Sequence, residues 1–181
     1  MKTLVIHPAD TSTDFLKPIY ANQDWTVIVD PQTSKRRLRE AINSHDRIIM
    51  LGHGTQDGLI AITNRAKMHY RYVISSELVY LLRNKITVGI WCNADVFFTK
   101  YDLRGFYTGM IISEIDEAYM YSVSAPGNDI DLSNELFAQS VKDGLTHNDV
   151  KSYVVGAYQI SGNRVVDFNR QNIYQNSKIN L

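Results

Sequence analysis

Hydrophobic residues gather along the chain in short runs that are rich in β-branched side chains. Runs of this length, bounded by turn or polar residues, are typical of strands, and a run that is apolar throughout indicates a strand buried on both faces. Five such runs are expected to form a main sheet: Lys2–Ile6, Trp25–Val29, Arg47–Leu51, Ile86–Trp91 and Met110–Ser113.

Segments with helical spacing separate these strands. Thr33 or Ser34 can cap a helix that extends to Asn43, in which Leu38 and Ile42 lie one turn apart on a face turned to the core. Strands that alternate with helices predict an α/β fold, with a mostly parallel central sheet and helices on both faces. Residues 1–181 are expected to form a single domain. Further helices are expected at Asp14–Tyr20, from Ser75 or Ser76 to Asn84, after Asn93, from Ser133 to Lys142 and at Asp149–Tyr158.

Four segments depart from this alternation. Leu59–Ile62 and Tyr70–Ile74 are expected to be short strands of an antiparallel excursion outside the main sheet. Ser122–Asp131 is rich in turn residues and predicts a loop. Val165–Tyr174 predicts a last strand, which would come directly before a polar tail.

Composition and charge exclude several classes of function. The 19 Lys and Arg residues are balanced by 19 Asp and Glu residues, so the net charge offers no electrostatic case for binding nucleic acid. The single cysteine rules out an internal disulfide and a zinc site of several thiolates. No window approaches the length of a membrane span, and the first apolar run is too short for a signal peptide. We therefore expect a cytoplasmic protein without membrane contact, metal or cofactor.

The residues that follow the third and fourth strands carry the candidate chemistry. Gly52, His53 and Gly54 follow Arg47–Leu51, and Cys92 follows the next strand. Parallel strands present their carboxyl ends at one edge, about 4.8 Å from strand to strand, so a thiol and an imidazole would meet there as nucleophile and base. A helix that starts after Cys92 would favour the thiolate. Gly54 frees the backbone to aim its N–H at an oxyanion, and the Cys92 amide is the natural second donor.

These two segments resemble a known pair of motifs. IIMLGHG, which contains His53, and ITVGIWCNAD, which contains Cys92, are similar to the paired motif of the caspase-like cysteine peptidases. That clan includes caspases, metacaspases, legumain, gingipains, separase and CHAT-domain proteases, and no single subfamily matches closely. The resemblance implies a flavodoxin-like three-layer sandwich with strand order 2-1-3-4-5. It also implies His53 as general base and acid, Cys92 as nucleophile, and an oxyanion hole formed by the amides of Gly54 and Cys92.

Two positions depart from the pattern of the clan. In several members the residue two before the nucleophile is polar or charged and helps to read the P1 side chain of the substrate, whereas Ile90 stands there in this chain. The P1 preference therefore cannot be transferred. Many members have Ala immediately before the nucleophile, and this chain has Trp91. Its indole would either narrow the groove or pack beneath it.

Other polar residues at the expected rim are candidates for substrate binding. Acids dominate among them, and a carboxylate at the base of a pocket pairs best with Arg or Lys, so a basic P1 residue is expected to be preferred over an acidic one. The alternative is that the acids only cap turns and helices, and that the histidine after the first strand is structural. The candidates are His7, Asp10, Asp95, Ser122, Ser124, Asp129 and Asp131.

The function expected from these residues is that of a cysteine endopeptidase, which cleaves peptide bonds through a Cys92 thioester and acts on peptide or protein substrates. Two alternatives stay open: a non-catalytic binding or scaffold domain on the same sheet, and a small-molecule cysteine hydrolase or amidase. An activating partner or a homodimer is compatible with either enzyme.

Overall fold

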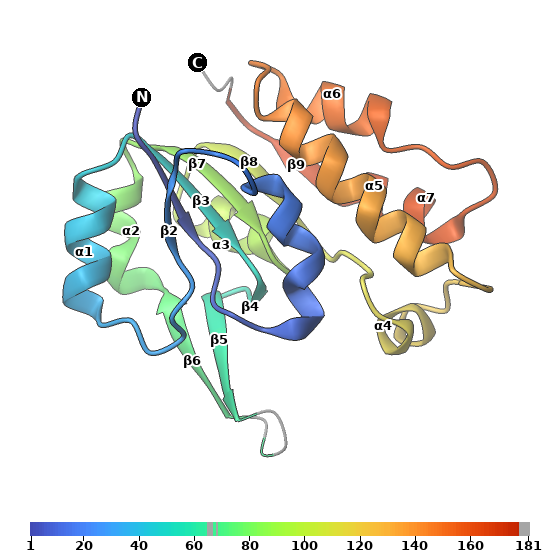
Figure 1. Ribbon diagram of the computed structural model, residues 1–181, viewed down its shortest axis with the longest axis horizontal. Coiled ribbons are helices and arrows are strands. Elements are labelled where there is room, and N and C mark those ends of the chain that lie inside the picture. Colours follow the sequence, from blue (N-terminus) through green and yellow to red (C-terminus); the bar gives the residue numbers. More distant parts are fainter. Residues whose placement is uncertain (65–66, 68, 178–181) are drawn as a thin grey trace.

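The protein is built around a six-stranded sheet in the order β2-β1-β3-β7-β8-β9, described by a computed structural model over residues 1–64, 67 and 69–177 (Figure 1). The first five strands of this order are parallel, and β9 pairs with β8 in the antiparallel sense. The strands are β1 (Thr3–Ile6), β2 (Thr26–Ile28), β3 (Arg47–Leu51), β7 (Ile86–Ile90), β8 (Gly105–Thr108) and β9 (Ile173–Gln175).

Helices cover both faces of this sheet, with α1 and α2 on one side in Figure 1 and α5, α6 and α7 on the other. The α/β class with a mostly parallel central sheet is therefore confirmed. No helix in the described part of the chain has the length and hydrophobicity to cross a bilayer. The helices are η1, a 3₁₀-helix (Thr11–Ile19), α1 (Lys35–Asn43), η3 (Ser76–Leu78), α2 (Val79–Leu82), α3 (Ala94–Lys100), α4 (Ile115–Met120), α5 (Asp129–Gly144), α6 (Val150–Ala157) and α7 (Arg164–Gln171).

Side chains that alternate along the central strands fill two separate cores. In β3, Ile48 and Met50 pack with α1, α2 and α3, whereas Ile49 and Leu51 pack with η1, α5 and α6. All four are completely buried. Burial on both faces explains why these strands are continuous apolar runs in the sequence.

The observed strand order differs from the predicted order 2-1-3-4-5. A sixth strand, β9, lies beyond β8, and the fifth parallel strand is Gly105–Thr108 instead of Met110–Ser113. The side-chain amide of Asn169 on α7 forms the hydrogen bonds to the Ile112 backbone that a neighbouring strand would otherwise form. It accepts from the Ile112 N–H at 2.7 Å and donates to the Ile112 carbonyl at 2.9 Å. The apolar segment 110–113 is therefore buried without being a strand.

The predicted strand Val165–Tyr174 is wrong over most of its length. Its first part belongs to α7, which is capped by Asn163 through a bond from the Val166 N–H. The buried residues Val165, Val166 and Asn169 follow a helical period. Because the last of them is polar, the helical pattern is hidden in the sequence.

Apart from α4, which was not predicted, the other helices follow the expectations with shifted boundaries. Ser34 caps α1 as expected. α5 begins at Asp129, so it takes the end of the predicted loop, and Ser133 lies inside the helix instead of capping it. Asp129 and Asp131 lie in the first turn of α5, where the helix dipole favours negative charge. That preference explains the earlier start.

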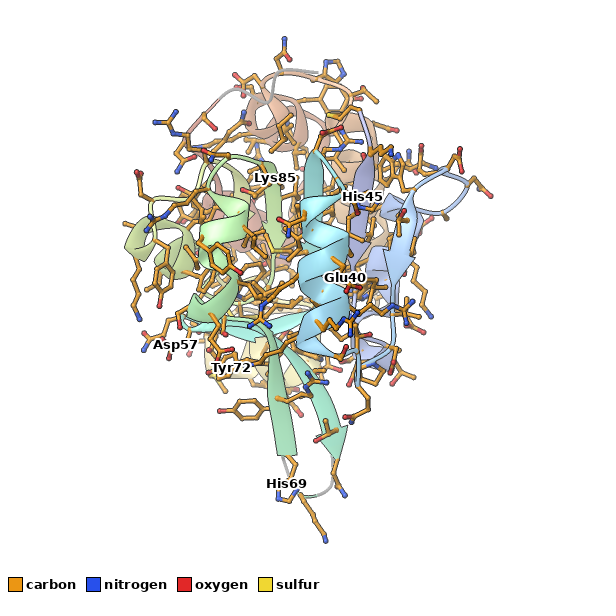
Figure 2. The ribbon with its side chains drawn as sticks, turned by 90° about the vertical axis from the view of Figure 1, so that its left-hand side faces the viewer. Glu40, His45, Asp57, His69, Tyr72 and Lys85 are labelled. Carbon is orange, nitrogen blue, oxygen red and sulfur yellow. The ribbon has the colours of Figure 1, made fainter. Side chains whose placement is uncertain are left out.

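A second, three-stranded antiparallel sheet projects from the rim of the main sheet. It has the order β4-β5-β6, with β4 (His53–Thr55), β5 (Gly58–Asn64) and β6 (His69–Ile74). Figure 2 shows its long hairpin extending away from the body of the protein, with His69 near the tip. The expected antiparallel excursion is confirmed, and its first strand begins at His53.

Candidate active site

His53 and Cys92 lie at the same rim because β3 and β7 are paired neighbours. The pairing ends at Leu51 and Ile90, and the Gly52 N–H then donates to the Ile90 carbonyl at 3.1 Å. Each of the two candidate residues comes two positions after the end of its strand. The sheet therefore brings together the imidazole and the thiol that the sequence placed on separate motifs.

Both side chains line one small cavity. Its walls come from η1, from the turn after β3, from the end of β7, and from the segment between β8 and α4. Its volume is about 30 Å³, which is room for about one or two water molecules. The cavity therefore has no room for the side chain of a ligand, although Cys92 itself is partly exposed.

The surroundings of Cys92 favour the thiol over the thiolate. Burial raises the pKa of Cys92 to about 11, and the charge of Glu117 adds to this effect, while the backbone N–H groups of Ile111 and Cys92 oppose it. Asn93 takes a left-handed conformation (φ 67°, ψ 28°), and α3 starts only at the following residue. The helix start and the imidazole, which were expected to favour the thiolate, are not among the groups that shift this pKa.

Glu117 is a residue of the cavity that sequence reasoning missed. Its Oε2 accepts hydrogen bonds from the Ser113 N–H at 2.7 Å, the Ser113 hydroxyl at 3.1 Å and the Glu114 N–H at 3.1 Å. Glu114 and Glu117 form a capping box at the start of α4. The spacing of these two acids after an apolar run is the signal that could have predicted it.

His53 is held from the side of η1. Its Nε2 lies 2.7 Å from the Ser12 hydroxyl and 3.6 Å from Asp10 Oδ1. The Ser12 hydroxyl donates to the same carboxylate oxygen at 2.7 Å, and that oxygen also caps η1 by accepting from the Ser12 N–H at 3.0 Å. The structure thus places Asp10 beside the imidazole, and it adds Ser12, which sequence reasoning missed. The Asp-x-Ser pattern at a helix start was the available signal.

His7 has a structural role instead of a place in the substrate groove. Its ring is 1% exposed. Its Nδ1 and Nε2 each lie 3.0 Å from a hydroxyl, that of Tyr20 and that of Thr13. Burial lowers the pKa of His7 to about 4, so the ring is neutral at physiological pH.

Asp95 does not line the cavity. It lies in the first turn of α3, and its charge contributes to the raised pKa of Tyr107, for which burial is the larger cause. Its Oδ1 is buried and has no hydrogen-bond partner among the described residues. The structure therefore does not place Asp95, a candidate for substrate binding, in the cavity with His53 and Cys92.

The four candidates after α4 also lie outside the cavity. Ser122 and Ser124 line a hollow of about 370 Å³ with residues of α7. Asp131 lines another hollow, also of about 370 Å³, which shares Ser113 with the cavity. Asp129 lines neither hollow. Among these four, only Asp131 is thus connected to the site.

Trp91 packs beneath the site. It is 2% exposed, its indole N–H donates to the Thr55 carbonyl at 3.1 Å, and its ring contacts Phe97 and Phe98. A Cβ on Gly54 would lie 1.9 Å from the indole, so only glycine fits at this position. Ile90 is 2% exposed and belongs to the core.

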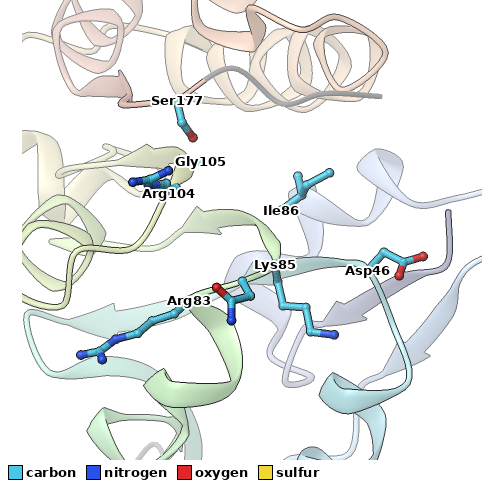
Figure 3. Close-up of a pocket in the computed structure, with 8 residues that line it drawn as sticks. Asp46, Arg83, Lys85, Ile86, Arg104, Gly105 and Ser177 are labelled. Atoms are coloured by element: carbon cyan, nitrogen blue, oxygen red, sulfur yellow. The ribbon is translucent and has the colours of Figure 1, made fainter.

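A further hollow of about 510 Å³ lies at the amino ends of β7 and β8, at the edge opposite the cavity (Figure 3). Its lining includes Arg83, Lys85, Arg104 and Asp46. Lys85 is engaged in the fold, since its ammonium group donates to the His45 carbonyl at 2.6 Å. None of the expected site residues lies there.

No protein-family model matches the sequence, and comparison with curated proteins gives no match. The link to the caspase-like clan therefore stays a resemblance carried by the two motifs. Within the described residues, no three His, Cys, Asp or Glu side chains gather closely enough to hold a metal ion.

Proposed function

We propose that the protein is a cysteine peptidase with a fold of the caspase-like, flavodoxin-like type, in which Cys92 is the nucleophile and His53 the general base. The supporting observation is that the two residues follow adjacent parallel strands and line one cavity. The carboxyl edge of an open parallel sheet is where such folds bind ligands. The order β2-β1-β3-β7 among the first four strands agrees with the resemblance.

The proposed reaction proceeds in two halves. His53 takes the thiol proton as the sulfur of Cys92 attacks the peptide carbonyl, and the negative charge moves to the carbonyl oxygen. The amide N–H groups of Gly54 and Cys92 are the proposed donors to that oxyanion. The C–N bond then breaks, the amine leaves with the proton from His53, and a thioester remains. Water, deprotonated by His53, hydrolyses the thioester and releases the acid product and the thiol.

The raised pKa of Cys92 and the small size of the cavity set a condition on this reaction. Because burial raises the pKa of Cys92 to about 11, the group is a thiol and not a thiolate at neutral pH. The thiol must therefore lose its proton to His53 as the substrate enters, instead of resting as a thiolate. Widening of the cavity is the step at which an activating partner or a second copy of the chain would act.

One observation favours an alternative. A cavity of about 30 Å³ is smaller than most ligand sites, which have volumes of about 300–1,000 Å³. This size admits neither a small-molecule amide nor a peptide without rearrangement, so it favours a domain that only binds its partner over either enzyme.

Digestion of a broad peptide library separates these functions. Wild type should cleave peptides, and Cys92→Ala and His53→Ala should each lose about a hundredfold or more of the rate. His69→Ala, an exposed histidine at the distant hairpin, is the matched control and should retain wild-type activity. Mass spectrometry of quenched wild type should detect an acyl group on Cys92. Cleavage that persists in Cys92→Ala, or a library left uncut by wild type, would refute the peptidase.

A further inference from the structure

A short chain of hydrogen bonds joins Asp10, Ser12 and His53 and reaches the imidazole ring at Nε2. The Ser12 hydroxyl is 2.7 Å from both Asp10 Oδ1 and His53 Nε2. The side chain of Asp10 is 11% exposed and that of His53 is 29% exposed. Partial burial strengthens such contacts, because water competes less for the donors and acceptors.

With Asp10 ionised and His53 neutral, the protons of this chain have only one consistent arrangement. An ionised carboxylate can only accept, so the single hydroxyl proton of Ser12 is donated to Asp10. The Ser12 oxygen must then accept from His53, and Nε2 carries the N–H. A neutral imidazole has one N–H, so Nδ1 holds the free lone pair. Within residues 1–64, 67 and 69–177, Nδ1 makes no hydrogen bond.

We propose that Asp10 and Ser12 are positioning residues that keep the His53 proton on Nε2 and thereby leave Nδ1 as the base for the Cys92 thiol. This inference rests on the proposed peptidase function. After Nδ1 accepts the thiol proton, both ring nitrogens carry protons and the ring is positive. The Nε2–H group stays hydrogen-bonded to the Ser12 oxygen, and the Asp10 carboxylate at 3.6 Å offsets the new positive charge of the ring.

The same arrangement argues against Ser12 as the nucleophile. A nucleophilic serine donates its proton to the histidine, and the carboxylate contacts the other ring nitrogen. In this protein the serine donates to the carboxylate, and both groups lie on Nε2. Cys92 is therefore the nucleophile that this imidazole can serve.

The ring-nitrogen chemical shifts of His53, measured by NMR on protein with isotope-labelled histidine, test the proposal without any substrate. At about pH 8, above the ordinary imidazole pKa, wild type should show the Nε2–H tautomer. Asp10→Ala frees the Ser12 hydroxyl to donate to Nε2, so the population should shift to the Nδ1–H tautomer. Ser12→Thr keeps the hydroxyl and should retain the wild-type tautomer.

Two further variants keep the test decisive. Asp10→Asn preserves an acceptor that can cap η1 but removes the charge, so it should fold and show a mixture of both tautomers. Asp14→Asn removes an acid of the same helix that pairs with Lys17 and should leave the shifts of His53 unchanged. An Nδ1–H tautomer in wild type, or wild-type shifts in both Asp10 variants, would overturn the proposal.

Alkylation of Cys92 by iodoacetamide connects the tautomer to the thiol. The rate should fall about tenfold in Asp10→Ala, a modest part of the effect that a positioned base provides, whereas Ser12→Thr should retain most of the wild-type rate. If wild type cleaves no peptide but the tautomer and alkylation results hold, the peptidase function fails and the positioning role stands. Unchanged alkylation in Asp10→Ala would contradict the positioning role.

Discussion

His7 and His53 follow two neighbouring strands, yet they differ in burial and in the charge of their partners. Both ring nitrogens of His7 face neutral hydroxyls, and the ring is 1% exposed. The side chain of His53 is 29% exposed and has a carboxylate within 3.6 Å. A buried ring without a charged partner resists protonation, whereas a carboxylate supports a positive ring. Of these two histidines, only His53 therefore has a partner that suits the role proposed for it.

Burial of His7 predicts a loss of stability in acid. Its pKa falls from 6.5 in the unfolded chain to about 4 in the folded protein. The contribution of His7 to stability is therefore complete above pH 6.5 and is lost as the pH falls from 6.5 through 4, by up to about 3 kcal/mol. Urea unfolding at several pH values should show a flatter acid dependence for His7→Gln than for wild type. His69→Gln is the control, and parallel curves for His7→Gln and wild type would contradict the prediction.

The residue types of the site follow from the sequence more readily than their partners do. His53 and Cys92 each end a recognisable strand, so their meeting could be predicted. Asp10 was expected to be a pocket acid, yet it contacts the imidazole through Ser12. The contact between Ser12 and His53 joins residues 41 positions apart. Its geometry depends on how η1 docks at the rim, which no local pattern specifies.

Helices and strands have their predicted boundaries where core packing determines them. They differ from the prediction where a side chain forms the hydrogen bonds that a neighbouring strand would otherwise form. β3 has its predicted boundaries because both of its faces are apolar. Segment 110–113 has the composition of a strand, but Asn169 provides the hydrogen bonds that a strand would give to Ile112. A single buried amide on a distant helix thus decides the conformation of this segment.

Substitution of Asn169 tests that account of the segment beside Cys92. In the wild type the Asn169 amide donates to the Ile112 carbonyl and to the Tyr158 hydroxyl. Asn169→Asp keeps the shape of the side chain but replaces this donor with an acceptor, so both groups lose a partner. The free energy of unfolding should fall by about 2–3 kcal/mol at neutral pH, because a buried acceptor is left unsatisfied. Gln139→Glu, an exposed position on α5, should change it by about 0.5 kcal/mol or less. Equal stability of the two variants, measured by urea unfolding, would show that the amide is dispensable.

At the scale of the whole molecule, the site lies where two parts of the chain close over one rim. η1 contributes one wall, and the segment leading into α4 contributes the other. Burial is the largest cause of the raised Cys92 pKa, and from this second wall Glu117 adds to it while the Ile111 N–H opposes it. The cavity depends on how these two walls pack and not on any strand or helix signal. For that reason the raised pKa of Cys92 could not be predicted from the sequence.

The hollow beside the cavity gives the expected basic P1 preference a specific source. Of the four candidate acids, Asp10 is bound to Ser12, and Asp95 and Asp129 do not line the hollow, whereas Asp131 does. Glu114 lines the same hollow, and no basic residue is among its lining side chains. Its volume of about 370 Å³ is within the range of small-ligand sites, about 300–1,000 Å³. A guanidinium or ammonium group entering from the cavity past Ser113 would meet two carboxylates.

Profiling with a substrate library varied at P1 decides whether this hollow reads the substrate. Wild type should prefer Arg or Lys over Asp at P1. Asp131→Asn and Glu114→Gln should each reduce the ratio of kcat/KM for Arg over Gln substrates about tenfold, the effect of losing one charge-assisted contact of about 1.4 kcal/mol. Asp129→Asn removes an acid from the same turn of α5 without touching the hollow, so it should leave the ratio unchanged. Cleavage after Asp but not Arg would refute the preference, and an equal loss in all three variants would show that net charge, rather than the hollow, selects the substrate.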